Sequence, residues 1–94
     1  MKFERTQRGF SLAQFTDSKG VTCSLQQSSI ATEDAIWLGV DNPEVVVFRP
    51  QQGGWQPVPI PADALIGSRM HLNREQVQAL LPALQRFAAT GNLE

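Results

Sequence analysis

Residues 69–91 read RMHLNREQVQALLPALQRFAATG, and two hydrophobic periodicities meet in this stretch with nothing between them. Met70 and Leu72 alternate with Arg69 and His71, which is typical of a β-strand with one inward and one outward face. The period then lengthens to that of an amphipathic helix. The stretch therefore predicts a last strand over residues 66–72 that leads directly into a C-terminal helix.

Both ends of this helix, expected over about residues 74–90, carry sequence signals. Asn73 can accept a hydrogen bond from the first turn, and Gln76 three positions later completes a capping-box pattern. Gly91 stands where a left-handed residue closes a helix. An apolar stripe at helical spacing predicts a surface that packs on one face of a sheet. Its members are Val77, Leu80, Leu81, Leu84, Phe87 and Ala88.

The upstream segments predict a mainly antiparallel sheet. Residues 10–16 and 21–27 alternate in polarity around an Asp-Ser-Lys-Gly turn and predict a hairpin. Residues 36–40 and 44–49 flank Asp-Asn-Pro and predict a second hairpin, whose second strand is apolar on both faces and is therefore expected to be central or covered on both sides. Residues 55–61 carry three prolines and form at most an edge strand.

The length of 94 residues allows one domain, residues 1–94. The predicted fold class is α+β: a mainly antiparallel sheet of about four to five strands over residues 9–72, with one C-terminal amphipathic helix packed on one face. Residues 1–8 are expected to be flexible. The stretch 28–35 fits either a loop or a short helical turn.

Composition bounds the location and the partner. No apolar run approaches the ~20 residues of a membrane helix, and no secretory signal is visible. A single cysteine excludes an internal disulfide, so we expect a cytoplasmic protein. The net charge is −1, and ten glutamines supply much of the polar surface, which disfavours nucleic acid as the default partner.

The residues that carry chemistry are few. Cys23 lies on the apolar side of its predicted strand and is interpreted as an inert buried thiol. His71 is the only histidine, so a zinc site has no recognised ligand spacing. No nucleophile elbow, phosphate-binding glycine loop or other catalytic signature is present. We expect no enzyme activity, no metal and no cofactor.

Four residues are candidates for binding. Arg69 and His71 share a strand face, and Arg74 opens a helix whose N-terminus favours anions, so the three could hold a phosphate or an acidic side chain. The alternative is that the arginines are solvated or pair with Glu33, Asp34 or Glu44. Trp55, after two glycines and before a proline-rich edge, is the fourth candidate.

Trp37 is the other tryptophan, and it stands between Ile36 and Leu38. These apolar neighbours favour a place in the core. Trp37 is therefore not among the expected binding residues.

Three blocks of the chain resemble a family of small uncharacterised proteins encoded by bacteriophages and prophages. They are CSLQQSSIATEDAIWLG (23–39), GWQPVPIP (54–61) and RMHLNREQVQALLP (69–82). The similarity spans most of residues 10–93. The link between positions 41 and 55 is shorter in this chain than in the members of the family. It implies a phage or prophage origin and carries over no activity or site.

The function expected from these observations is that of a small intracellular non-enzymatic binding protein, which contacts another protein of the phage or its host. The alternative is a nucleic-acid-binding module. It would use the basic strand-to-helix junction of Arg69, His71 and Arg74 together with the basic N-terminus, Lys2, Arg5 and Arg8.

Overall fold

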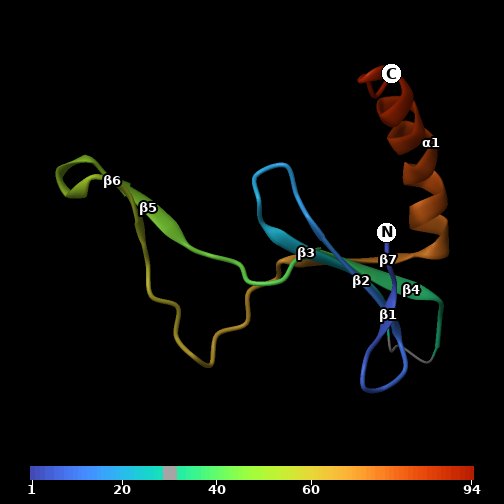
Figure 1. The fold of residues 1–94 in the computed structure, drawn as a ribbon, viewed down its shortest axis with the longest axis horizontal. Coiled ribbons are helices and arrows are strands. Elements are labelled where there is room, and N and C mark those ends of the chain that lie inside the picture. Colours follow the sequence, from blue (N-terminus) through green and yellow to red (C-terminus); the bar gives the residue numbers. More distant parts are fainter. Residues whose placement is uncertain (29–31) are drawn as a thin grey trace.

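The computed structural model describes residues 1–28 and 32–94 and shows an α+β fold (Figure 1). A five-stranded antiparallel sheet has the order β1-β2-β3-β4-β7, and β5 and β6 form a separate two-stranded sheet. The predicted fold class, a mainly antiparallel sheet with one C-terminal helix, is confirmed. The elements are β1 (Glu4–Arg5), β2 (Ser11–Thr16), β3 (Thr22–Gln27), β4 (Ala35–Val40), β5 (Val46–Arg49), the 3-10 helix η1 (Pro50–Gln52), β6 (Gly54–Pro57), β7 (Arg69–Asn73) and α1 (Arg74–Thr90).

The β2–β3 hairpin confirms the first predicted pair of strands. Asp17 organises its turn, because its Oδ1 accepts from the backbone N–H groups of Lys19 at 2.8 Å and Val21 at 2.9 Å. Gly20 follows with φ of 84°, a left-handed conformation that glycine adopts without strain. The short strand β1, within the stretch expected to be flexible, pairs with the outer edge of β2.

The predicted hairpin between residues 36–40 and 44–49 is wrong. β4 pairs with β3 and β7, whereas β5 pairs with β6. The backbone N–H of Asp41 donates to the carbonyl of Thr22, so the chain stays beside β3 instead of reversing at the Asp-Asn-Pro segment. β5 turns back a few residues later through η1 and Gly53, whose φ is 91°. β5 is therefore part of a projecting hairpin and not a central strand.

The stretch 28–35, which fits either a loop or a helical turn, is described only in part. Residues 29–31 lie outside the described residues. From Ala35 onward the chain is strand β4.

Helix α1 begins where β7 ends, and both predicted caps are confirmed. The Asn73 side chain accepts from the Gln76 backbone N–H at 2.9 Å, and the Gln76 side chain accepts from the Asn73 N–H at 3.0 Å. Gly91 ends the helix with φ of 81° and donates its N–H to the carbonyl of Phe87. Asn73 is thus both the last residue of β7 and the cap of α1, which leaves no linker between them.

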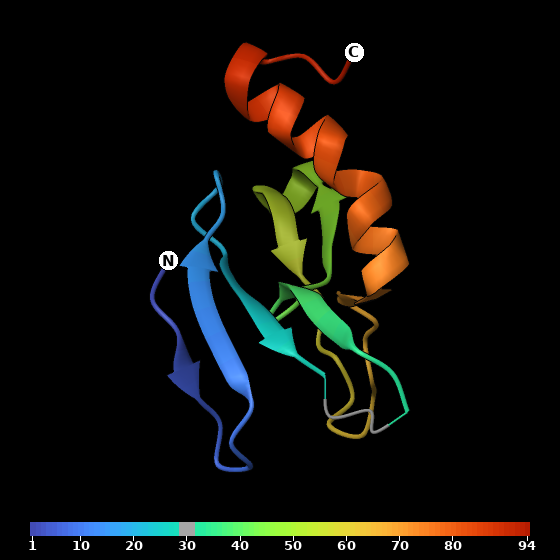
Figure 2. The same ribbon diagram turned by 90° about the vertical axis from the view of Figure 1, so that its right-hand side faces the viewer.

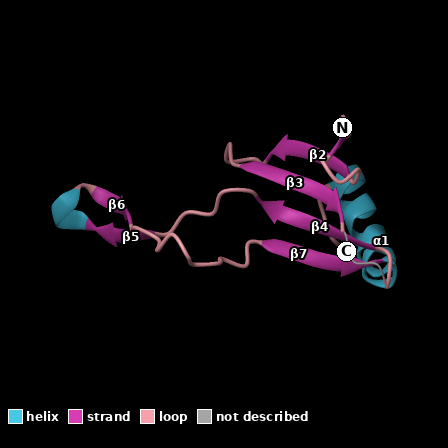
Figure 3. Ribbon diagram, turned by 90° about the horizontal axis from the view of Figure 1, so that it is seen from below, coloured by secondary structure: helices cyan, strands magenta, loops and turns pink. Residues whose placement is uncertain are grey.

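The packing of α1 differs from the sequence-based expectation. The helix rises from the end of β7 and stands away from the sheet (Figures 1 and 2), and the view from below shows it at the end of the sheet where β7 ends (Figure 3). No residue of α1 is buried. β7 ends at Asn73 and α1 begins at Arg74, so the extended backbone of Asn73 (φ −88°, ψ 178°) sets the direction in which the helix leaves the sheet. Within residues 1–28 and 32–94, no helix has the length and apolar character that crossing a bilayer requires.

Strand pairing divides the side chains of the main sheet between two faces. Directly opposed residues share a face, and neighbours along a strand alternate. One side, the apolar sheet face, carries Phe15, Leu25, Ile36, Leu38, Met70 and Leu72. The other side, the polar sheet face, carries Gln14, Ser24, Trp37, Arg69 and His71.

Candidate binding surfaces

The polar sheet face brings two of the candidate residues together. Trp37 on β4 stands opposite His71 on β7, and Gly39 stands opposite Arg69. Because Gly39 has no side chain, β7 lies so close that an added Cβ would be 2.6 Å from the Arg69 Cα. The Arg69 side chain therefore lies across β4 toward the residues that follow it.

Asp41 is the polar centre of this face. Its Oδ1 accepts from Arg69 Nη2 at 3.2 Å, and its Oδ2 accepts from Gln14 Nε2 at 3.1 Å. Partial burial acts to raise the pKa of Asp41, but hydrogen bonds from Ser24 and Gln14 and the charge of Arg69 outweigh it, so the net pKa is lowered. Arg69 thus has a carboxylate partner, although a different one from the three considered from the sequence.

The aromatic ring of Trp37 lies beside both basic side chains. Its centroid is 5.2 Å from that of the His71 ring, with 45° between the planes. The Arg69 guanidinium carbon is 5.8 Å from the Trp37 centroid, within the range of a cation–π contact. The expectation that Trp37 is a core residue overlooked the strand alternation: Ile36 and Leu38 lie on the apolar sheet face, so Trp37 lies on the polar one.

A shallow hollow opens beside this cluster. It is lined by Trp37 and His71 from the sheet and by Ile60 and Ile66 from the segment between β6 and β7. The indole Nε1 of Trp37 is buried and has no hydrogen-bond partner among the described residues. Because that nitrogen is inaccessible, it cannot bind a ligand in the hollow. The charged groups that line the hollow, Arg69 and Asp41, already pair with each other, so the rest of its surface is mainly apolar.

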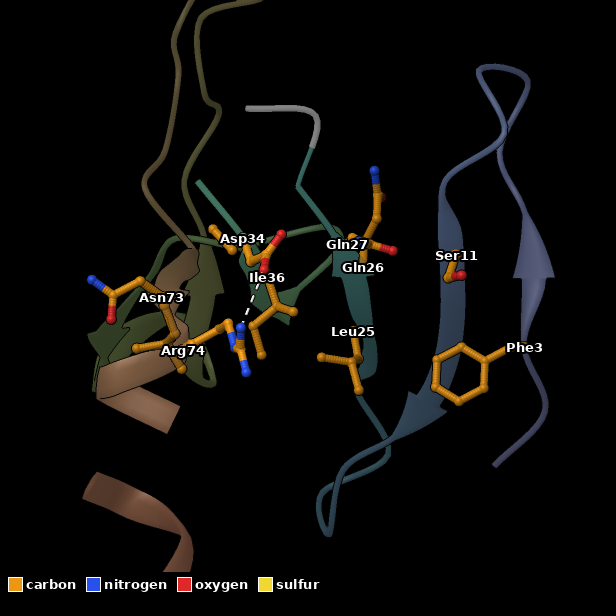
Figure 4. Close-up of a pocket in the computed structure, with 11 residues that line it drawn as sticks. Phe3, Ser11, Leu25, Gln26, Gln27, Asp34, Ile36, Asn73 and Arg74 are labelled. Carbon is orange, nitrogen blue, oxygen red and sulfur yellow. Dashed lines mark ion pairs between the residues drawn. The ribbon is translucent and has the colours of Figure 1, made fainter. Parts of the chain in front are cut away.

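Arg74 does not join Arg69 and His71. Its Nη1 lies 3.7 Å from Asp34 Oδ2, and both side chains are about three-quarters exposed. An exposed pair of this kind contributes little to stability. Arg74 borders a hollow on the apolar sheet face (Figure 4), on the other side of the sheet from Trp37. The predicted anion site is therefore divided between two faces.

The basic N-terminus lies far from the junction. β1 and β7 are the two outer strands of the main sheet, so Arg5 is separated from Arg69 by roughly four strand spacings, or ~19 Å. Arg5 donates to the Gly9 carbonyl and to Ser11 Oγ, and the Arg8 guanidinium lies 5.8 Å from the Phe10 ring centroid. The cations needed for nucleic-acid binding are thus spread over both edges.

Trp55 lies on the hairpin of β5 and β6, which projects from the main sheet as an arm (Figure 1). It stands opposite Phe48, with ring centroids 5.4 Å apart and 56° between the planes. Phe48 is 59% exposed and Trp55 is 67% exposed. With Val46 and Pro57, which pair on the same side, they form the aromatic arm face. The sequence-based assignment of Trp55 to the surface agrees with this position.

Cys23 is buried on the apolar side of β3. Burial raises the pKa of the thiol, and the charges of Asp17 and Asp41 add to that effect. The thiolate, which is the reactive form, is therefore disfavoured. His71 lies on the opposite face of the sheet, so the thiol and the imidazole cannot meet.

Comparison of the chain with protein-family models, with curated proteins and with solved structures finds no match. The similarity to phage-encoded proteins rests on the sequence blocks alone and stays a prediction.

Proposed function

We propose that this chain is a small non-enzymatic binding protein that contacts another protein through the aromatic arm face. The observation that carries the proposal is the pair Phe48 and Trp55, which lie together at the end of an arm and are each more than half exposed. Tryptophan is strongly enriched among residues that dominate binding energy. The resemblance of the sequence to phage-encoded proteins makes a protein of the phage or its bacterial host the expected partner.

The construction of the arm supports a docking role. β5 and β6 have four residues each and pair only with each other among the described strands. An isolated two-stranded hairpin is marginally stable in water. A partner that buries one face of the arm would add the apolar contact that the hairpin lacks.

The charge distribution favours protein over nucleic acid as the partner. Arg49 is the only cation between Val45 and Gln56, so the arm offers little of the phosphate neutralisation on which nucleic-acid binding depends. At the strand-to-helix junction, Arg69 faces Asp41 and Arg74 faces Asp34. Nucleic-acid binding through these residues would compete with the partly buried Arg69–Asp41 pair, whereas the exposed Arg74–Asp34 pair would oppose it little.

Affinity capture from a bacterial lysate tests the proposal. The full-length tagged chain is compared with Trp55→Ala and with the control Leu65→Ala, which removes a 97% exposed side chain from the segment between β6 and β7. We expect the wild-type chain and Leu65→Ala to capture a protein whose binding survives nuclease treatment. The purified partner should bind Trp55→Ala at least ~30-fold more weakly than the wild-type chain, as a loss of ~2 kcal/mol implies.

Two results would contradict the proposal. Equal capture by all three chains would show that the aromatic arm face makes no contact. A signal that disappears with nuclease would favour the nucleic-acid alternative. Circular dichroism of Trp55→Ala should retain the signal of the helix and the main sheet, because the lost contact is with Phe48 at the arm and not with the main sheet.

A further inference from the structure

The main sheet and the helix each leave an apolar surface uncovered. In the described part of the chain, the buried hydrophobic residues are Ala13, Cys23 and Ala35, and no large side chain is fully buried. Met70 on the apolar sheet face is 55% exposed. The two halves of a hydrophobic core are therefore present without facing each other.

The second half is the apolar stripe of α1. Leu80, Leu81, Leu84 and Phe87 recur at helical spacing and are between 44% and 56% exposed. A water-soluble helix of a globular protein normally turns such a stripe toward the core. Here the helix stands away from the sheet, so the stripe needs another apolar surface (Figure 2).

The accessible area of the chain, compared with that of a compact monomer, shows how much surface is uncovered. The accessible area is 7832 Å² for a chain of 10.4 kDa. A compact monomer of that mass exposes ~5400 Å², so the surplus is ~2400 Å². The radius of gyration is 16.8 Å, against ~12 Å for a compact domain of this length. A standard interface buries ~800 Å² on each partner, so the surplus is enough for a large dimer contact even though the arm accounts for part of it.

A hollow of about 300 Å³ marks the place on the sheet where side chains could enter (Figure 4). Leu25, Ile36 and Leu72 form its apolar floor, with Phe3 on one side and Arg74 on the other. The hollow adjoins the start of α1, so a helix entering from a second molecule would lie beside the first molecule's own helix.

We propose that two copies of this chain pair by exchanging helices, so that the leucine stripe of each α1 packs on the apolar sheet face of the other. A second copy is the occupant because each chain supplies both surfaces, and a two-fold axis satisfies both contacts at once. In the structure the capping box at Asn73 and Gln76 holds the start of the helix in the orientation that points it away from its own sheet. The proposal is independent of the partner that binds the aromatic arm face.

Sedimentation equilibrium and thermal unfolding of the full chain over a hundredfold range of concentration give the first test. We expect a particle with twice the 10.4 kDa mass of the chain. Its unfolding midpoint should rise with concentration, because association stabilises the folded state by mass action. A monomer throughout this range, with a constant midpoint, would overturn the proposal.

A charge placed in the stripe gives the second test. Leu84→Glu keeps a good helix former but puts a carboxylate where the partner sheet would pack. The control Gln78→Glu adds the same charge about a third of a turn away from the stripe. We expect Leu84→Glu to weaken dimerisation at least 100-fold or to leave the chain unfolded, and the control to remain dimeric. A folded Leu84→Glu dimer with wild-type affinity would refute helix exchange.

Isotope-filtered NMR on a mixture of labelled and unlabelled chains identifies the contact itself. Helix exchange predicts cross-peaks between Leu84 or Phe87 of one chain and Ile36 or Leu72 of the other. If the same cross-peaks arise only within one chain, the helix closes on its own sheet, and the proposal fails even if a dimer forms. Trp55→Ala should leave these cross-peaks unchanged, which separates this test from that of the arm.

Discussion

Replacing Gly39 with alanine tests the close backbone approach of β7 to β4. The new Cβ would lie 2.6 Å from the Arg69 Cα and would also contact the Ser68 carbonyl oxygen. Ordinary carbon contacts lie at ~3.5–4.0 Å, so β7 would have to move by about 1 Å. Both neighbouring atoms belong to the backbone, and no side-chain rotation can relieve the contact.

The cost has two parts. Overpacking in a tightly fitted site costs ~1–3 kcal/mol. Displacement of β7 also weakens two hydrogen bonds, from the Val40 N–H to the Ser68 carbonyl at 3.3 Å and from Ser68 Oγ to the Val40 carbonyl at 3.0 Å, each contributing ~1 kcal/mol. We therefore expect Gly39→Ala to lower the free energy of unfolding by ~3–5 kcal/mol.

Urea unfolding followed by tryptophan fluorescence measures this loss. The midpoint should fall by ~2–3 M for a chain of this size, with the slope m unchanged. The control is Gly67→Ala, because a Cβ there meets nothing within 4 Å, and its expected change is within ~0.5 kcal/mol. If Gly39→Ala unfolded within ~0.5 kcal/mol of the wild type, the close contact between β4 and β7 would be refuted.

Three further changes have defined outcomes. Asp41→Asn should flatten the loss of stability in acid: the lowered pKa of Asp41 means that its ionised form stabilises the fold above pH ~4 and that this contribution is lost as pH falls through the folded pKa. The fall in the urea midpoint from pH 7 to pH 3, measured for the wild type and for Asp41→Asn, tests this. An equal fall in both proteins would contradict the stabilising role of the ionised Asp41. Asn73→Ala should cost ~1 kcal/mol in the same assay by removing the helix cap, and a change below ~0.3 kcal/mol would count against that role. The Cys23 thiol should react with a thiol reagent at least ~100-fold more slowly in the native protein than in urea, and equal rates would show that it is accessible.

Local signals in the sequence predicted the elements well. The polarity alternation around the Asp17 turn corresponds to the β2–β3 hairpin, and the Asn73–Gln76 capping box corresponds to the start of α1. These features depend on residues close together in the chain. Hydrogen bonds between near neighbours decide them, so short sequence windows contain the necessary information.

Pairings between distant segments could not be predicted in the same way. The apolar run in β5 fits a central strand, yet its partner is β6, because the turn through η1 and Gly53 brings that strand back within a few residues. The apolar stripe of α1 predicts burial but does not specify what buries it. An amphipathic pattern reads the same whether the covering surface belongs to its own chain or to another.

The candidate binding residues show the same difference between local and long-range information. Strand alternation alone places Arg69 and His71 on one face, as expected. Their neighbour Trp37 lies in β4, and Asp41 follows the end of that strand. Asp41 is more than twenty-five positions along the chain from Arg69. That pairing depends on the register of β4 against β7, which no local pattern in the sequence specifies.

The direct junction at Asn73 has a mechanical consequence. With 17 residues, α1 extends about 25 Å from a single pivot. A 10° change in the twist of β7 would therefore sweep the far end of the helix through roughly 4 Å, whereas a flexible joint would absorb the same rotation. A contact at the tip of α1 is thus coupled to the strand that carries Arg69 and His71, through a helix in which Pro82 removes one internal hydrogen bond.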